Sequence, residues 1–301
     1  MPSPNDTVCL PRFGSLCSRV AKAMGLAPLA FASEKQRLWM RAAEDALKEL
    51  ADGGALTAGY SFIAYDERWS TAPLNLLFSS GAERYGKPSG KSVAHSLALP
   101  AGQFPPVSLR AVGASLEGRR ASSFIEDFAR ECGSAQEARV FVVAHEFAHA
   151  WQTAHGFVHI RLAAEKCAAD SPIAQEMISI IDSYGNSPPT PREERQPAHV
   201  CRILFEESVA DAIGCWVLAR RGASKPFKSL SNLREADQGS NGLDLNHYTS
   251  WLLSFIDARR PTLANQKFPE FMAELSSIIA ARAPAIFQSF ERAASPRNPK
   301  P

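Results

Sequence analysis

One apolar stretch that contains two histidines and a glutamate places the strongest constraint on how this chain folds. The stretch runs from residue 140 to residue 152 and reads V-F-V-V-A-H-E-F-A-H-A-W-Q. Its apolar residues predict a helix that is mostly buried where the histidines begin. Two imidazoles and a carboxylate are costly on so apolar a helix unless something pairs with them. We therefore expect His145, Glu146 and His149 to have partners elsewhere in the fold.

These three residues have the spacing H-E-x-x-H. Residues four apart lie about one turn apart on the same face of a helix, so His145 and His149 can direct their imidazoles at one point. Two ligands of a zinc ion need that geometry. Glu146 lies beside this point, where a carboxylate can accept the proton of a metal-bound water. The pattern predicts one catalytic Zn²⁺ ion with Glu146 as the general base.

The composition is that of an ordinary globular protein. Of the 301 residues, 45% are apolar and 21% are charged, and the net charge is +2. That charge does not indicate a nucleic-acid partner, and no long basic run occurs. We therefore predict no nucleic-acid partner. No apolar stretch reaches the roughly 18 residues of a membrane span. The six cysteines form no C-x-x-C pair, so we expect most of them to be buried free thiols.

We expect a single domain over residues 33–294, a flexible leader over residues 1–32 and a disordered tail over residues 295–301. In the leader, basic residues precede a short apolar run that ends in Ala30-Phe-Ala32, which fits a cleavage site although the run is interrupted. A cytoplasmic location, a bacterial-type export route and a classical signal peptide all stay open. The oligomeric state is open as well.

The order of local patterns predicts an α+β fold, with a small mixed β-sheet in the N-terminal half and a mainly helical C-terminal half. A first helix is expected from Ser33 to Gly53. Runs rich in aromatic and β-branched residues then predict strands over residues 60–65, 74–78, 93–99 and 107–111. His95 falls among them and is expected to be a polar residue on a sheet face. The sheet-rich part with the motif helix spans 33–155, and the helical part spans 156–294.

From about residue 120 the apolar residues recur at helical spacing. Ser134 and Glu137 form a capping box, which predicts that the motif helix begins there and runs to about His155, with Gly156 after its end. Further helices are predicted over 161–184 with a break at Pro172, and over 199–221, 246–258 and 269–283, the last interrupted by Pro284. Residues 229–242 are expected to form a polar linker.

A catalytic zinc site needs a third protein ligand, and His155 is one candidate. The run from His145 to His155 has the metzincin spacing H-E-x-x-H-x-x-G-x-x-H, except that Gln152 replaces the glycine. That glycine allows the sharp turn that brings the third histidine back. If the helix continues, His155 lies about 80° off the face of His145. His155 is therefore expected to be a histidine at the helix end, favoured there by the helix dipole.

Glu207 is the other candidate, and it is the one that we favour. Glu207 and Asp211 are four apart on a strongly predicted helix, so they face one direction. A glutamate there can bind the metal, and Asp211 can accept the N–H of a ligating histidine and fix its tautomer. Glu206 is expected to lie on a solvated acidic face.

The run H-E-F-A-H at 145–149, followed by E-S-V-A-D at 207–211, resembles the gluzincin group of zinc metallopeptidases. The resemblance covers about residues 134–222 and identifies no subfamily. It implies a zincin fold in which Zn²⁺ is bound by His145, His149 and Glu207. It also implies that a zinc-activated water hydrolyses peptide bonds of a peptide or protein substrate.

A donor for the developing oxyanion would complete such a site, and His247, Tyr248 and His199 are the candidates. Three alternatives to a general endopeptidase stay open. One is a zincin-like regulatory or interaction protein with narrow or no protease activity. Another is a non-peptide hydrolase that uses the same site, and the last is a metzincin-like site that uses His155.

Overall fold

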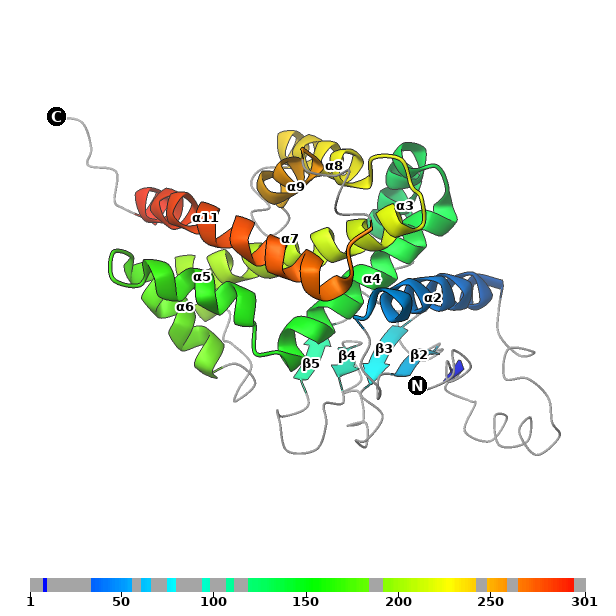
Figure 1. The fold of residues 1–301 in the computed structure, drawn as a ribbon, viewed down its shortest axis with the longest axis horizontal. Helices are drawn as coiled ribbons and strands as arrows, with labels where there is room; N and C mark the ends of the chain where they lie inside the picture. The colour runs from blue at the N-terminus through cyan, green and yellow to red at the C-terminus, as the bar shows by residue number, and fades with distance from the viewer. Residues whose placement is uncertain are drawn as a thin grey trace.

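The computed structural model describes residues 8–9, 34–55, 61–65, 75–79, 94–97, 107–110, 119–183, 192–241, 248–258 and 265–294. The motif helix, α4 (Ala135–Ala154), packs mainly against α7 (Pro197–Arg220), and also against α2 (Glu34–Gly53) and α3 (Arg119–Cys132). The remaining helices are α5 (Val158–Cys167), α6 (Pro172–Ser183), the 3₁₀ turn η4 (Glu193–Arg195), α8 (Pro226–Asn241), α9 (Ser250–Asp257) and α11 (Phe268–Ala294). Figure 1 shows α8 and α9 on one side of the α4–α7 pair and the strands on the other.

Among the described residues of the N-terminal part, five short strands are present. They are β1 (Val8–Cys9), β2 (Ser61–Tyr65), β3 (Asn75–Ser79), β4 (Ala94–Leu97) and β5 (Val107–Arg110). They form a three-stranded sheet in the order β1-β2-β3 and a separate antiparallel pair of β4 and β5. β1 runs parallel to β2, whereas β2 and β3 are antiparallel, with Ile63 opposite Leu77.

The prediction of an α+β fold is wrong. Of the residues whose backbone and side chains are both described, 84% are helical and none belongs to a strand. The buried apolar core of these residues comes from helices and the turns between them. Aromatic and β-branched residues favour extended backbone locally, but such short runs do not make a sheet the organising element of the domain. The fold is therefore built around the α4–α7 pair.

Local signals explain where the two central helices begin and end. The hydroxyl of Ser134 accepts a hydrogen bond from the backbone N–H of Glu137 at 3.1 Å, so the predicted cap of α4 is confirmed. Gly156, with φ of 59°, follows the end of α4 as predicted. Pro197 occupies the first position of α7, where its missing N–H costs nothing. Gly222, with φ of 86°, lies just past the end of α7.

Burial of α7 is nearly complete, since every residue from Ser208 to Ala219 is buried. Gly214 allows α4 to approach closely, because a Cβ at this position would lie 2.6 Å from ring atoms of Phe141. Cys132, Cys167, Cys201 and Cys215 are buried free thiols, as expected. Among the described residues, no helix is both long and apolar enough to cross a membrane.

Two helix predictions were wrong in the C-terminal half. The expected linker over 229–242 belongs to α8, since Phe227, Leu230 and Arg234 are buried at helical spacing. Helix α11 continues through Pro284 to Ala294. Proline costs roughly 3 kcal/mol inside a helix, and the helix continues because residues on both sides of it, Ala283 and Phe287, pack into the core. The predicted tail and most of the predicted leader lie outside the described residues.

Candidate metal centre

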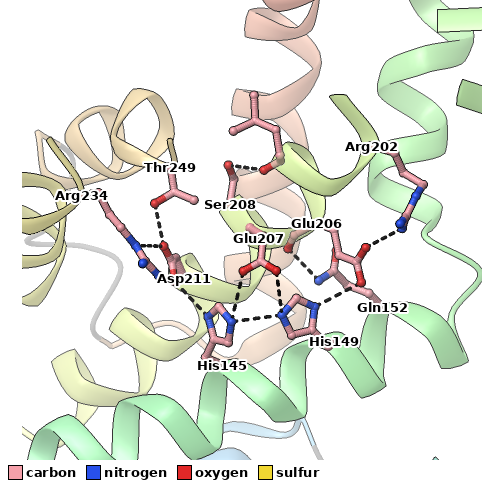
Figure 2. A network of polar contacts seen from close by, with 11 residues as sticks. His145, His149, Gln152, Arg202, Glu206, Glu207, Ser208, Asp211, Arg234 and Thr249 are labelled. Carbon is pink, nitrogen blue, oxygen red and sulfur yellow. Dashed lines mark hydrogen bonds and ion pairs between the residues drawn. The ribbon is translucent and has the colours of Figure 1, made fainter. Parts of the chain in front are cut away.

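The two histidines of the motif lie on the face of α4 that meets α7. Their Nε2 atoms are 3.0 Å apart, and about 10% of each side chain is exposed. Figure 2 shows both imidazoles extending from α4 toward α7, with Glu207 opposite them. The predicted convergence of His145 and His149 on one point is therefore seen in the structure.

Glu207 of α7 completes a group that could hold a metal ion. One carboxylate oxygen lies 3.3 Å from Nε2 of His145, and the other lies 3.6 Å from Nε2 of His149. Ligands about 2.0–2.1 Å from a tetrahedral ion are about 3.3 Å from one another. The 3.0 Å between the two Nε2 atoms and the 3.3 Å from Nε2 of His145 to Oε2 of Glu207 are close to that value, whereas the 3.6 Å from Nε2 of His149 is to the other oxygen, Oε1. We call His145, His149 and Glu207 the ligand triangle; one donor atom from each residue lies within 4.8 Å of the other two, so the group could hold a metal ion.

Asp211 holds the first histidine of the ligand triangle. Its Oδ1 lies 2.9 Å from Nδ1 of His145, and because a carboxylate only accepts, Nδ1–H donates. Nε2 is thereby left to face Glu207 and His149. Arg234 of α8 donates two hydrogen bonds to the same carboxylate, at 3.0 and 2.9 Å, and Thr249 donates a third at 2.6 Å. Asp211 is fully buried, so four hydrogen bonds fix its orientation.

Glu206 was expected on a solvated face, and that prediction was wrong. Only 6% of Glu206 is exposed, and its Oε1 lies 3.2 Å from Nδ1 of His149. Arg202, one turn earlier on α7, forms an ion pair with the other oxygen. The second histidine is therefore held in the same way as the first, by a carboxylate that an arginine neutralises (Figure 2).

These contacts set the charge states of the metal-free site. Burial alone would lower the pKa of His145, but hydrogen bonds to Asp211 and Glu207 raise it to about 10. Burial alone would raise the pKa of the Asp211 carboxyl, but Arg234 and His145 hold it well below its usual range. The pKa of Glu206 is likewise lowered, because Arg202 and His149 outweigh its burial.

The charges around the ligand triangle favour a cation. Three buried or half-buried carboxylates contact the two histidines, and guanidinium groups pair with two of them; the groups are Glu206, Glu207, Asp211, Arg202 and Arg234. The two histidines cannot both carry a proton on Nε2, because two N–H groups cannot face each other across the 3.0 Å between these atoms. A cation bound by neutral imidazoles would lie against the carboxylate of Glu207.

Glu146 is 2% exposed and follows His145 directly on α4. At 100° per residue it points about 80° from the mean direction of the two histidines, so it lies on the flank of the helix face that carries them. His155 lies outside the triangle. Its Nδ1 is 2.8 Å from the carbonyl oxygen of Trp151, and its ring stacks on that indole.

The three proposed oxyanion donors differ in how they lie relative to the ligand triangle. Tyr248 is 38% exposed and precedes Thr249, which contacts Asp211. His199 is buried near the start of α7, about 12 Å along the helix axis from Glu207. His247 lies outside the described residues, and of His95 only the backbone in β4 is described.

Arg202, Arg234 and Thr249 were not predicted as part of the site, and Glu206 was predicted on a solvated face. A signal existed for Arg202 and Glu206, because they are four apart on one helical face, within the apolar run that includes Leu204 and Phe205. The contact of Arg234 with Asp211 depends on how α8 docks, which no local pattern encodes.

No protein-family model, no curated protein and no solved structure matches the chain. Interpretation of the site therefore rests on its geometry and on the motif spacing.

Proposed function

We propose that the chain is a zinc-dependent hydrolase that acts on peptide bonds. The proposal rests on the ligand triangle beside Glu146. Two imidazoles and one carboxylate are a common ligand set of catalytic zinc, which keeps one position for water. When bound, the metal would lower the pKa of a coordinated water toward neutrality and polarise a substrate carbonyl. The likeness of residues 145–149 and 207–211 to the gluzincin motifs supports a peptide substrate.

Each residue of the site then has one task. His145, His149 and Glu207 hold the ion. Asp211 accepts a hydrogen bond from Nδ1–H of His145 and so keeps the lone pair on Nε2, where it would bind the ion. Glu146 accepts a proton from the attacking water and passes it to the leaving amine.

Substitution of Glu146 with glutamine tests this function. Glutamine keeps the size of the side chain but cannot accept the proton. We expect hydrolysis of a mixed peptide library to fall by about 10²–10⁴-fold, the usual contribution of a general base. The zinc content, measured by mass spectrometry, should stay at that of the unsubstituted protein. Full activity of Glu146→Gln with zinc bound would refute the proposed role.

The zinc-loaded protein also discriminates between an enzyme and a binding module. Hydrolysis that chelator abolishes and added zinc restores would support the hydrolase. Stoichiometric zinc without turnover of any peptide in the library would instead favour the regulatory or interaction protein.

A further inference from the structure

Glu206 connects α4 and α7 at two points, next to the ligand Glu207. Its side chain accepts a hydrogen bond from Nδ1 of His149 at 3.2 Å, and its backbone carbonyl accepts one from Nε2 of Gln152 at 3.0 Å. His149 and Gln152 are three apart, on one face of α4. Residue 206 therefore fixes the register between the helix that carries His149 and the helix that carries Glu207.

Arg202 is held on two sides. Its guanidinium pairs with Glu206 and lies 5.7 Å from the ring centre of Phe157. Phe157 is 3% exposed and has φ of 53°, a left-handed conformation that is costly for a residue with a Cβ. This conformation places an aromatic face under Arg202 at the turn between α4 and α5. Strained backbone of this kind persists only where its surroundings demand it.

We propose that Glu206, Arg202 and Gln152 form a clamp that positions His149 for metal binding, separate from the Asp211–Arg234 pair that positions His145. The proposal rests on the metal site of the proposed function. In the clamp, Gln152 fixes the helix register, Glu206 orients the imidazole through Nδ1, and Arg202 holds the Glu206 side chain in place through their ion pair. The two positioning pairs reach the ligand triangle from different directions, as Figure 2 shows.

A double substitution separates the effect of Arg202 and Glu206 on the position of His149 from their effect on the stability of the fold. Removing Arg202 alone would take away the guanidinium partner of the buried Glu206 carboxylate, which is strongly destabilising in itself. The double variant Arg202→Met with Glu206→Met replaces the buried ion pair with apolar side chains, an exchange that is often neutral or stabilising. His149 then loses the acceptor of its Nδ1–H. We expect metal-free protein that unfolds near the wild-type temperature and binds Zn²⁺ about 10–100-fold more weakly in chelator competition, the usual effect of losing a ligand's hydrogen-bonded partner.

Two further variants complete the test. Glu206→Gln keeps an acceptor for His149 and should recover most of the zinc affinity. The pair Glu137–Arg221 also joins α4 to α7, at 2.8 Å, but contacts neither histidine through an observed hydrogen bond or ion pair. The matched variant Glu137→Met with Arg221→Met should lower the unfolding temperature and leave zinc affinity unchanged.

Unchanged zinc affinity in the Arg202/Glu206 double variant would overturn the clamp, and so would an equal loss in the Glu137/Arg221 control. Absence of zinc binding by the wild-type protein would overturn the clamp and the proposed metal site together. Zinc binding with no peptide hydrolysis would refute only the proposed function, because the test of the clamp measures Zn²⁺ affinity and not hydrolysis.

Discussion

Gly214 on α7 offers a way to disturb the metal site without touching a ligand. An added Cβ would lie 2.6 Å from Cδ2 and Cε2 of Phe141 and 3.3 Å from the backbone oxygen of Phe141. Carbon atoms pack best at about 3.5–4.0 Å, so α4 and α7 would have to separate locally by about 1 Å. Phe141 cannot turn away easily, because its ring packs against Phe124 and Phe128.

The expected change in stability is a balance of two effects. Alanine in place of glycine inside a helix gains about 1 kcal/mol. Overpacking of a buried site costs about 1–3 kcal/mol. Gly214→Ala should therefore lose up to about 2 kcal/mol of unfolding free energy in the metal-free protein. At about 2–4 °C per kcal/mol for a chain of this size class, the unfolding temperature should fall by a few degrees.

Gly214→Ala should affect Zn²⁺ affinity more strongly than the free energy of unfolding. Phe141 precedes His145 by one turn of α4, and Gly214 follows Asp211 by about one turn of α7. Separation of the helices at the Phe141–Gly214 contact would therefore lengthen the His145–Asp211 hydrogen bond, which is 2.9 Å long. A displacement of about 1 Å is large beside the 3.0 Å between the two Nε2 atoms and the 3.3 Å from Nε2 of His145 to Glu207. We expect Gly214→Ala to weaken Zn²⁺ binding by about 10-fold or more in chelator competition.

A control variant at another close helix contact and a second substitution that relieves the clash test this prediction. Gly53→Ala would place a Cβ 2.3 Å from Trp216, so it should also destabilise the protein, but at the contact of α2 with α7. Its zinc affinity should stay at the wild-type value. Adding Phe141→Leu to Gly214→Ala removes the clashing ring atoms and should restore part of the lost affinity. Wild-type zinc affinity in Gly214→Ala would refute the argument that this close approach sets the geometry of the site.

Other predictions concern the ligand, the charge states and the thiols. Glu207→Ala removes one corner of the ligand triangle, and its zinc affinity should fall by more than the roughly 10–100-fold expected for an outer contact. In the metal-free protein the pKa of His145 is raised to about 10 from the unfolded value of about 6.5. The stability that this provides is fully present below about pH 6.5 and lost as the pH rises toward 10, so the unfolding temperature should fall over that window, and this fall should vanish in the zinc-loaded protein. Burial raises the pKa of the Cys201 and Cys215 thiols, and we expect a thiol reagent to label both only after denaturation.

Local patterns predicted the part of the site that depends on one helix at a time. The capping box at Ser134, the apolar run before His145 and the four-residue spacing of the histidines define α4 and one face of it. The spacing of Glu207 and Asp211 defines a face of α7 in the same way. These features follow from the 3.6-residue period of a helix, which requires no knowledge of the rest of the chain.

Only the tertiary structure decided which of these faces meet and what else they bury. Glu206 looked like an exposed neighbour of Glu207, yet its contacts with His149 and Gln152 across the helix interface make it part of the site. The α+β prediction failed for the same reason, because runs of β-forming residues report local preference and not which elements form the core. Arg234 donates its hydrogen bonds to Asp211 from α8, most of which was predicted to be a linker. A helix period fixes directions around its own axis, whereas the partners of a buried charge are fixed by packing between segments far apart in the chain.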